Sequence, residues 1–265
     1  QSRGLGDVYK RQGKKYMMME TAVYGREFLY AKELVGSGKL GKIQFMRGSH
    51  QQNMGLPGWP PYWYGLPPMH YATHAISPLL MLANTTAEYV VCHGSGQISD
   101  EYAEKYNSPF AAETTTIKFK DSKLVAEVTR SLFDTIRQYR ESFDVYGTKL
   151  SFEWEQVAEE GAVIFCGFED AERIKIPDFA HLLPDEIAPF TTGGVYDDEH
   201  EHTSFIQGAG HGGSHPHMVH EFVRAIVEDR DAVPDGKTSA NWTMAGICSH
   251  ESAMNGGERI YIPEP

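Results

Sequence analysis

SFDVYGTKLSFEWE, residues 142–155, is the segment that decides the fold class of this chain of 265 residues. In its second half the apolar residues Leu150, Phe152 and Trp154 alternate with polar ones. A period of two residues is typical of a β-strand with one face buried and the other face in water. The segment therefore predicts one strand of a mainly antiparallel sheet.

The segments around it extend this pattern into an open sheet. Two helical segments close the chain, at Pro216–Glu228 and about Thr238–Met254, before a last short strand, RIYIP, at 259–263. We expect an α/β chain of the α+β type, an open and mainly antiparallel sheet with helices on one face. Four more strands are predicted by runs rich in β-branched and aromatic residues, EYVVCHG (88–94), AETTTIKFK (112–120), KLVAEVTRSLF (123–133) and AVIFCGF (162–168).

A different arrangement precedes the sheet. KYMMME, at Lys15–Glu20, is a short apolar run bounded by charge, which is typical of a strand buried on both faces. Apolar residues spaced by four, three and four from Tyr24 to Val35 then predict a helix, which ends at two glycines. A strand over Gly41–Gln52 follows.

The glycines after this helix match a dinucleotide-binding pattern, because GSGKLG at Gly36–Gly41 reads G-x-G-x-x-G. That fingerprint needs a strand before the glycines and a helix after them, so that phosphates meet the helix N-terminus. Here the order is reversed. We therefore interpret these glycines as a helix stop and turn, and we expect no phosphate-binding loop in this chain.

Composition excludes several classes of function. Asp and Glu number 36 against 24 Lys and Arg, a net charge of −12, which disfavours nucleic acid as a partner. Apolar runs fall short of the roughly 18 residues that cross a membrane, so we expect no membrane partner. Cys92, Cys166 and Cys248 lie far apart, which fits neither a disulfide framework nor a thiolate zinc site. This usage fits a reducing compartment, and we expect the cytoplasm.

The candidate catalytic segment is HYATH, His70–His74, at the start of a helix predicted to run to Leu82. Its two imidazoles, four residues apart, share one helix face with Tyr71 beside them. Pro78 lacks the N–H that would bond the His74 carbonyl, so we expect distorted backbone at His74. Histidine suits acid–base chemistry near neutral pH, and tyrosine can relay the proton. Two core or capping histidines are the alternative interpretation.

Two loops are candidate ligand contacts. HGGSHPHMVH, residues 211–220, carries four histidines and resembles a zinc cluster, yet His215 stands before a proline at a predicted helix start. We therefore expect His211 and His215 to contact a ligand, and no metal. Trp59 and Trp63 lie in a proline-stiffened aromatic loop whose flat rings suit a sugar. A loop that packs its own rings is the alternative.

The order of these elements resembles the Gfo/Idh/MocA family of nicotinamide-dependent sugar and polyol oxidoreductases. KELVGSGKLGKI, Lys32–Ile43, is similar to that family's helix-to-strand junction, and His74 falls on the histidine of its D-x-x-x-H motif. The resemblance implies NAD or NADP as cofactor and a sugar or cyclic polyol as substrate. It implies that His74 takes the hydroxyl proton, that Tyr71 relays it, and that His70, where the family has Asp, positions His74 or the substrate.

A branch of the same superfamily shows a second resemblance. YATHAISP, residues 71–78, is similar to the Y-P-T-H-G-x-G-P segment of NAD-dependent α-N-acetylgalactosaminidase-like glycosidases, and MMME and HGG agree with that branch. The resemblance implies that Glu20 lies near the cofactor or substrate, with His50 or Gln52 as a further polar contact. A redox-type glycosidase or lyase is thus the alternative to a dehydrogenase.

The resemblance also divides the chain. Residues 1–12 look like translated adaptor sequence from a metagenomic assembly, and we expect a non-native leader there. Residues 13–40 are expected to be the last strand and crossover helix of a Rossmann domain whose front half is missing, which would leave this fragment alone inactive. Residues 41–265 are expected to be a substrate-binding domain that forms a homo-oligomer through its sheet face. A metal-dependent hydrolase at the histidine cluster and a non-catalytic assembly module are the remaining alternatives.

Overall fold

A computed structural model describes residues 12–137, 140–192 and 210–264, and nearly all of the expected leader lies outside this range. A nine-stranded open sheet dominates the fold, in the order β8-β7-β6-β5-β1-β4-β3-β2-β9. Every neighbouring pair is antiparallel except β1 and β4, so the predicted sheet type is confirmed. The strands are β1 (Ile43–Gln51), β2 (Ala87–Ser95), β3 (Ala112–Phe119), β4 (Val125–Ser131), β5 (Arg140–Gly147), β6 (Ser151–Glu153), β7 (Ala162–Phe165), β8 (Ala171–Ile174) and β9 (Ile260–Tyr261).

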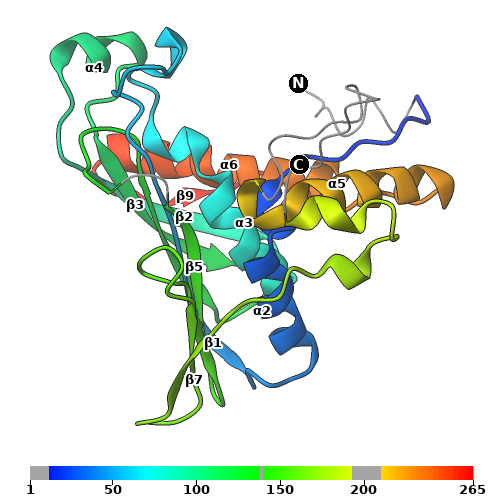
Figure 1. Ribbon diagram of the computed structural model, residues 1–265. Coiled ribbons are helices and arrows are strands. Elements are labelled where there is room, and N and C mark those ends of the chain that lie inside the picture. The colour runs from blue at the N-terminus through cyan, green and yellow to red at the C-terminus, as the bar shows by residue number, and fades with distance from the viewer. Residues whose placement is uncertain (1–11, 138–139, 193–209, 265) are drawn as a thin grey trace.

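The long helices gather on one face of the sheet, as Figure 1 shows, which confirms the predicted layering. Short α4 lies apart, at the end of the sheet where the tryptophan loop also folds. In the part of the chain that the structure describes, no helix covers the other face (Figure 1). None of its helices is long and apolar enough to cross a membrane. The helices are α2 (Arg26–Gly36), α3 (Thr73–Leu82), α4 (Asp100–Tyr106), α5 (Gly210–Val227) and α6 (Gly236–Met254), with short 3-10 turns η1 (Thr21–Val23), η2 (Pro61–Trp63), η3 (Pro68–Tyr71), η4 (Ala180–Leu182) and η5 (Ala188–Thr191).

Helix α3 lies at the centre of the core. Its residues 75–80 are all buried, which is the pattern of a helix covered on every side. Phe28 from α2 and Trp242 from α6 pack into the same apolar cluster, with Phe152 contributed by the sheet. The start of α3 is therefore held at a fixed place between the sheet and the other helices.

The backbones of β1 and α3 meet at Gly48. A methyl group at this glycine would lie 2.1 Å from the carbonyl oxygen of Ala75, too close for any side chain. Since Gly48 stands two residues before His50 and Ala75 follows His74, this contact sets the spacing between two candidate site residues.

We predict that Gly48→Ala lowers the free energy of unfolding by about 3 kcal/mol, because α3 must move away from the sheet to admit the methyl group. Gly36→Ala is the matched control, since a methyl group there meets nothing within 4 Å. Denaturant unfolding monitored by circular dichroism measures both changes. Equal stability of the two variants would show that the close contact is not rigid.

Several sequence predictions differ from the structure. Lys15–Glu20 forms no strand, because none of the described strands pairs with it, and a strand needs such a partner. The segment 142–155 is a hairpin of β5 and β6 rather than one strand, since the Gly147 N–H bonds the Leu150 carbonyl in a tight turn. A methyl group at Gly147 would lie 2.1 Å from the Leu40 carbonyl oxygen, so the turn needs glycine. Helix α4 and strand β8 were not predicted.

Candidate functional site

His74 lies in the first turn of α3, and the backbone breaks just before it at Ala72 (φ −113°, ψ 5°). His70 belongs to the separate turn η3, so the prediction that the two histidines share one helix face is wrong. The irregular backbone lies at Ala72, and α3 continues through Pro78. The backbone breaks at Ala72 because η3 is held by a different element of the fold. The Met69 N–H of η3 donates to a buried carboxylate on the sheet at 2.7 Å.

That carboxylate, Glu113 on β3, is fully buried and also binds the His250 ring of α6, with 2.7 Å between Oε1 and Nδ1. The His70 ring packs edge-on against His250 at 4.9 Å between centroids. The structure therefore places His70 in a second polar cluster, with His250 and Glu113.

Glu20 is the direct partner of His74. Its carboxylate, only 1% exposed, accepts a short hydrogen bond from His74 Nδ1 and caps η1 through the Ala22 N–H. Burial alone lowers the pKa of His74, but the hydrogen bond and the charge of Glu20 outweigh burial, and the pKa is raised above its ordinary value. A buried carboxylate on one ring nitrogen leaves Nε2, 3.4 Å from the Tyr71 hydroxyl, as the nitrogen that can exchange a proton, an arrangement typical of an acid–base histidine.

We predict that Glu20→Gln lowers the pKa of His74, because burial and the charge of Arg130 are then opposed by the charge of Glu141 alone. The raised pKa means that the charged pair stabilises the folded state below about pH 6.5, and that this stabilisation is lost as pH rises through the His74 pKa. The wild type should therefore exceed Glu20→Gln in stability most at low pH. Histidine NMR titration and unfolding at several pH values measure both effects, and an unchanged His74 pKa would contradict them.

Tyr71 closes the other side of the His74 ring. Its hydroxyl lies 3.4 Å from His74 Nε2, so the predicted neighbourhood of these two residues exists. Burial raises the pKa of the Tyr71 hydroxyl, while the Arg130 guanidinium, centred 5.1 Å above the ring, opposes this. Tyr71 therefore stays a neutral hydrogen-bonding hydroxyl at physiological pH.

Arg130, on β4, is a fully buried cation that sequence analysis missed. It donates to the carbonyl oxygens of Tyr71 at 2.7 Å and His50 at 3.0 Å, and to Gln52 Oε1 at 2.7 Å. The sequence pattern could have revealed Arg130. It follows Ala126 and Val128 at alternate positions of a strand, and these positions point inward. A charge at such a position indicates a buried polar network.

The two polar residues predicted on β1 lie on the inner side of the sheet. His50 is fully buried, with its ring 5.3 Å from the His74 ring between centroids. Burial and the charge of Arg130 lower the pKa of His50 well below its ordinary range, so the ring is neutral. Gln52 is buried and bonded to Arg130, whereas His50 packs against the His74 ring.

Glu141, on β5, connects His50 to the HGG segment. Its two carboxylate oxygens lie 3.5 Å from His50 Nε2 and 3.3 Å from His211 Nδ1. The His211 ring is 5.9 Å from the His74 ring, whereas His215 stacks behind His211 at 5.7 Å. The structure thus brings His211 next to His74 and Glu141, whereas His215 lies behind His211.

The HGG segment adopts a backbone that few sequences allow. His211, Gly212 and Gly213 all have positive φ, at 49°, 62° and 76°. The Arg26 side chain of α2 holds the segment by donating to the Gly212 carbonyl at 3.3 Å and to the Thr191 carbonyl at 3.2 Å. The glycines are needed here because two consecutive left-handed residues with side chains would be strained.

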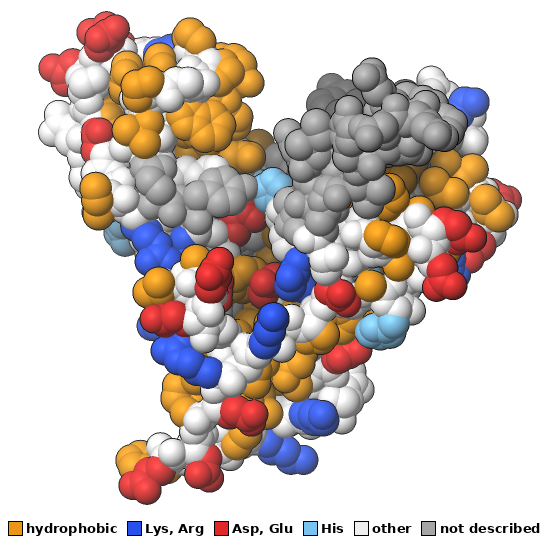
Figure 2. Space-filling view, in the orientation of Figure 1, with side chains coloured by type: hydrophobic (Ala, Val, Ile, Leu, Met, Phe, Trp, Pro, Cys, Tyr) orange, Lys and Arg blue, Asp and Glu red, His pale blue; other side chains and the backbone are white. Residues whose placement is uncertain are grey.

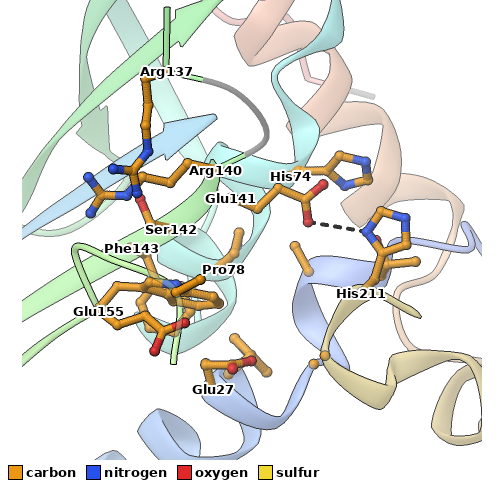
Figure 3. A pocket seen from close by; sticks show the side chains of 17 residues that line it. Glu27, His74, Pro78, Arg137, Arg140, Glu141, Ser142, Phe143, Glu155 and His211 are labelled. Carbon is orange, nitrogen blue, oxygen red and sulfur yellow. Dashed lines mark hydrogen bonds and ion pairs between the residues drawn. The ribbon is translucent and has the colours of Figure 1, made fainter. Parts of the chain in front are cut away.

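A cavity of about 250 Å³ opens beside His74 (Figure 3). Figure 3 shows His74, Glu141 and His211 together at one side of it, with the two arginines of its wall on the other. Further lining residues come from α2, α3, β5 with the segment before it, and the segment after β6, among them Glu27, Pro78, Arg137, Arg140, Phe143, Trp154 and Glu155. No group of His, Cys, Asp and Glu within the described ranges could hold a metal ion.

The tryptophan loop lies beside this cluster rather than in the cavity wall. Trp63 packs against Tyr71 at 4.9 Å between ring centroids, and Trp59 packs behind Trp63 at 6.3 Å. Together with Phe133 and Tyr102 they belong to a second, smaller apolar cluster. Figure 2 shows an apolar surface over the lobe that carries α4, and Tyr62 of the loop is 60% exposed.

Comparisons with known proteins give structural neighbours alone. No protein-family model and no curated protein matches this chain. A levoglucosan dehydrogenase in complex with NADH matches with a TM-score of 0.74 at 17% identity, covering 98% of this chain and 69% of that chain. Two further structures match similarly. An oxidoreductase domain protein from Kribbella flavida has a TM-score of 0.70 at 16% identity, covering 98% of this chain and 68% of that chain. An NAD binding oxidoreductase from Klebsiella pneumoniae has a TM-score of 0.69 at 14% identity, covering 98% of this chain and 69% of that chain.

These neighbours are oxidoreductases of the Gfo/Idh/MocA type, and at such low identity the likeness is one of fold. The levoglucosan dehydrogenase match spans nearly the whole of this chain, 98% of it. This chain has the fold of the Gfo/Idh/MocA-type oxidoreductases.

Proposed function

We propose that this chain is the substrate-binding part of an NAD(P)-dependent oxidoreductase that oxidises a hydroxyl group of a sugar or cyclic polyol. One observation carries the proposal: His74, paired with buried Glu20 and beside the Tyr71 hydroxyl, lines a cavity. The neighbouring structures support it, since one of them is levoglucosan dehydrogenase in complex with NADH and levoglucosan.

The described residues could contact the nicotinamide ring of a cofactor, but they include no loop that would hold its phosphates. Near His74 they offer buried Glu20 and the buried Thr21 hydroxyl, which has no hydrogen-bond partner among the described residues. The glycines at 36–41 follow α2 and precede β1, so no described helix begins at a phosphate-binding loop. We propose that a Rossmann domain holds the nucleotide, that residues 13–40 are a remnant of that domain, and that residues 41–265 bind the substrate.

In the proposed mechanism His74 Nε2 takes the proton of the substrate hydroxyl. Glu20 holds the opposite nitrogen and stabilises the imidazolium that forms. Tyr71, 3.4 Å from Nε2, orients or relays the proton, and Glu141 fixes the His211 ring over the same space. When bound, the cofactor accepts a hydride from the carbon that carries the hydroxyl.

Isotope transfer tests the proposal. A sugar deuterated at the reacting carbon is incubated with oxidised cofactor and with the enzyme formed by joining a Rossmann domain to this chain, and the reduced nicotinamide is analysed by mass spectrometry. The proposal predicts deuterium on the nicotinamide ring in the presence of the enzyme. Oxidised cofactor that gains no deuterium from any of a panel of sugars and cyclic polyols would contradict it.

A redox-type glycosidase or lyase is the second candidate function. It is favoured by the convergence of Tyr71, His74 and the HGG segment, the residues that carry the resemblance to that branch. Such an enzyme releases the glycosidic substituent and re-reduces the sugar, so it needs only catalytic cofactor. Release of nitrophenol from nitrophenyl glycosides without net formation of reduced cofactor would distinguish it from a dehydrogenase.

We further propose a homo-oligomer that forms through the open face of the sheet, in the cytoplasm. The face is amphipathic: Phe45 stacks on Tyr146, and Arg47 pairs with Glu127 at 3.4 Å on the same side. Such a surface suits a second copy of the chain. Light scattering of the wild type and of Phe45→Glu tests this, and a monomeric wild type would contradict it.

A further inference from the structure

Two arginines line the same cavity as His74 and take no part in the mechanism above. Arg137 and Arg140 both bond to Gln156, the first through the Gln156 carbonyl at 2.5 Å and the second through its Oε1 at 3.0 Å. Figure 3 shows their side chains on the part of the wall away from His211. The hydrogen bonds to Gln156 thus hold two cations on one side of a small cavity.

Neither guanidinium has a carboxylate within ion-pair distance in the part of the chain that the structure describes. The Nε–H of Arg140 is buried and has no hydrogen-bond partner among the described residues. Burial lowers the pKa of Arg140. The negative charge of Asp144 opposes this effect, and the like charge of Arg137 adds to it. A buried, unsatisfied donor beside a second cation is unfavourable unless a ligand completes it.

The carboxylates of the same cavity are engaged elsewhere. Glu141 faces His50 and His211, and Glu155 accepts a hydrogen bond from the Gly161 N–H at 3.0 Å. Burial raises the pKa of Glu27 to about 7, so this side chain is largely uncharged below neutral pH. Glu141 and Glu155 thus have partners other than the two arginines.

We propose that Arg137 and Arg140 bind an anionic group, a carboxylate or a phosphate, on the sugar or polyol whose hydroxyl faces His74. This inference rests on the proposed function and names its substrate class, an acidic or phosphorylated sugar. The planar guanidinium fork matches the geometry of carboxylate and phosphate oxygens. A cavity of about 250 Å³ suits one sugar unit, because pockets for larger ligands measure about 300–1,000 Å³.

Binding of three matched sugars to the chain, without cofactor, tests the inference. D-glucuronate carries a carboxylate, D-glucose 6-phosphate a phosphate, and D-glucose neither. Titration calorimetry at low salt compares the wild type with Arg137→Gln and Arg140→Gln, and near-ultraviolet circular dichroism checks folding. Arg47→Gln is the matched control, since it removes one positive charge on the open face of the sheet.

We expect at least one anionic sugar to bind about tenfold or more tightly than glucose, and each cavity variant to lose about that factor, with Arg47→Gln unchanged. Which of the two anionic sugars binds better identifies the group. If Arg140→Gln fails to fold, Arg137→Gln still measures the contribution of the arginines to anion binding, because Arg137 is at an exposed position. Equal affinity for all three sugars, no binding, or anionic preference retained in Arg137→Gln would overturn the inference. Glucose binding without that preference would leave the proposed function intact, because His74 needs no anion.

Discussion

His74→Ala is expected to reduce turnover of the cofactor-loaded enzyme by about 10²- to 10⁴-fold, the usual contribution of a proton-transfer residue. One nitrogen of the His74 ring is held by Glu20 and the other, Nε2, lies 3.4 Å from the Tyr71 hydroxyl, so the alanine variant loses the base to which Tyr71 would relay the proton. Binding of the nicotinamide cofactor should change little, since His74 acts on the substrate hydroxyl. Steady-state kinetics and a cofactor titration measure the two effects.

His93→Ala is the matched histidine control, because His93 is exposed on β2 and does not line the cavity. It should leave turnover within the range of the wild type. Full activity in His74→Ala would remove His74 from the mechanism, and loss of activity in both variants would point to a change in folding instead.

Arg130→Ala is expected to lower the free energy of unfolding by about 4 kcal/mol. The change leaves the buried carbonyl oxygens of Tyr71 and His50 and the Gln52 side chain without their donor. Each buried acceptor that loses its partner costs about 1–3 kcal/mol, and the vacated space adds to this loss. Chemical denaturation with a fluorescence readout measures the change.

Arg47→Ala serves as its control, since Arg47 pairs with Glu127 on the open face of the sheet and both side chains are substantially exposed. Exposed pairs contribute about 0–1 kcal/mol, so a small effect is expected. If the Arg130 and Arg47 variants proved equally stable, the buried network would not be what holds Tyr71 beside His74.

The sequence predicted the sheet well because alternation of apolar and polar residues depends on local packing alone. Strands β2, β3, β4 and β7 lie where the pattern placed them. It failed at 142–155, where the period of two runs through a turn that only the backbone contact at Gly147 requires. At Lys15–Glu20 the described residues supply no partner strand, and the prediction had assigned the partners of that strand to a Rossmann domain that these residues do not form.

The candidate site was predicted in part for a similar reason. Tyr71 and His74 are close in sequence and in space, whereas Glu20, which bonds His74, and Glu141, which faces His211, come from elements far apart in the chain. His70 was misplaced because the break at Ala72 depends on a hydrogen bond to Glu113, more than forty residues away. Spacing along the sequence cannot show such pairings.

The central claim is that the cavity beside His74 is where the substrate hydroxyl binds. Carbon-edited NMR of the histidine Cε1–Hε1 groups, recorded while a panel of neutral and acidic sugars is added, tests it directly. The account predicts saturable shifts at His74 and His211, with His93 and His250 unmoved. Shifts confined to His70 and His250, or none at His74 with any sugar that binds, would contradict it.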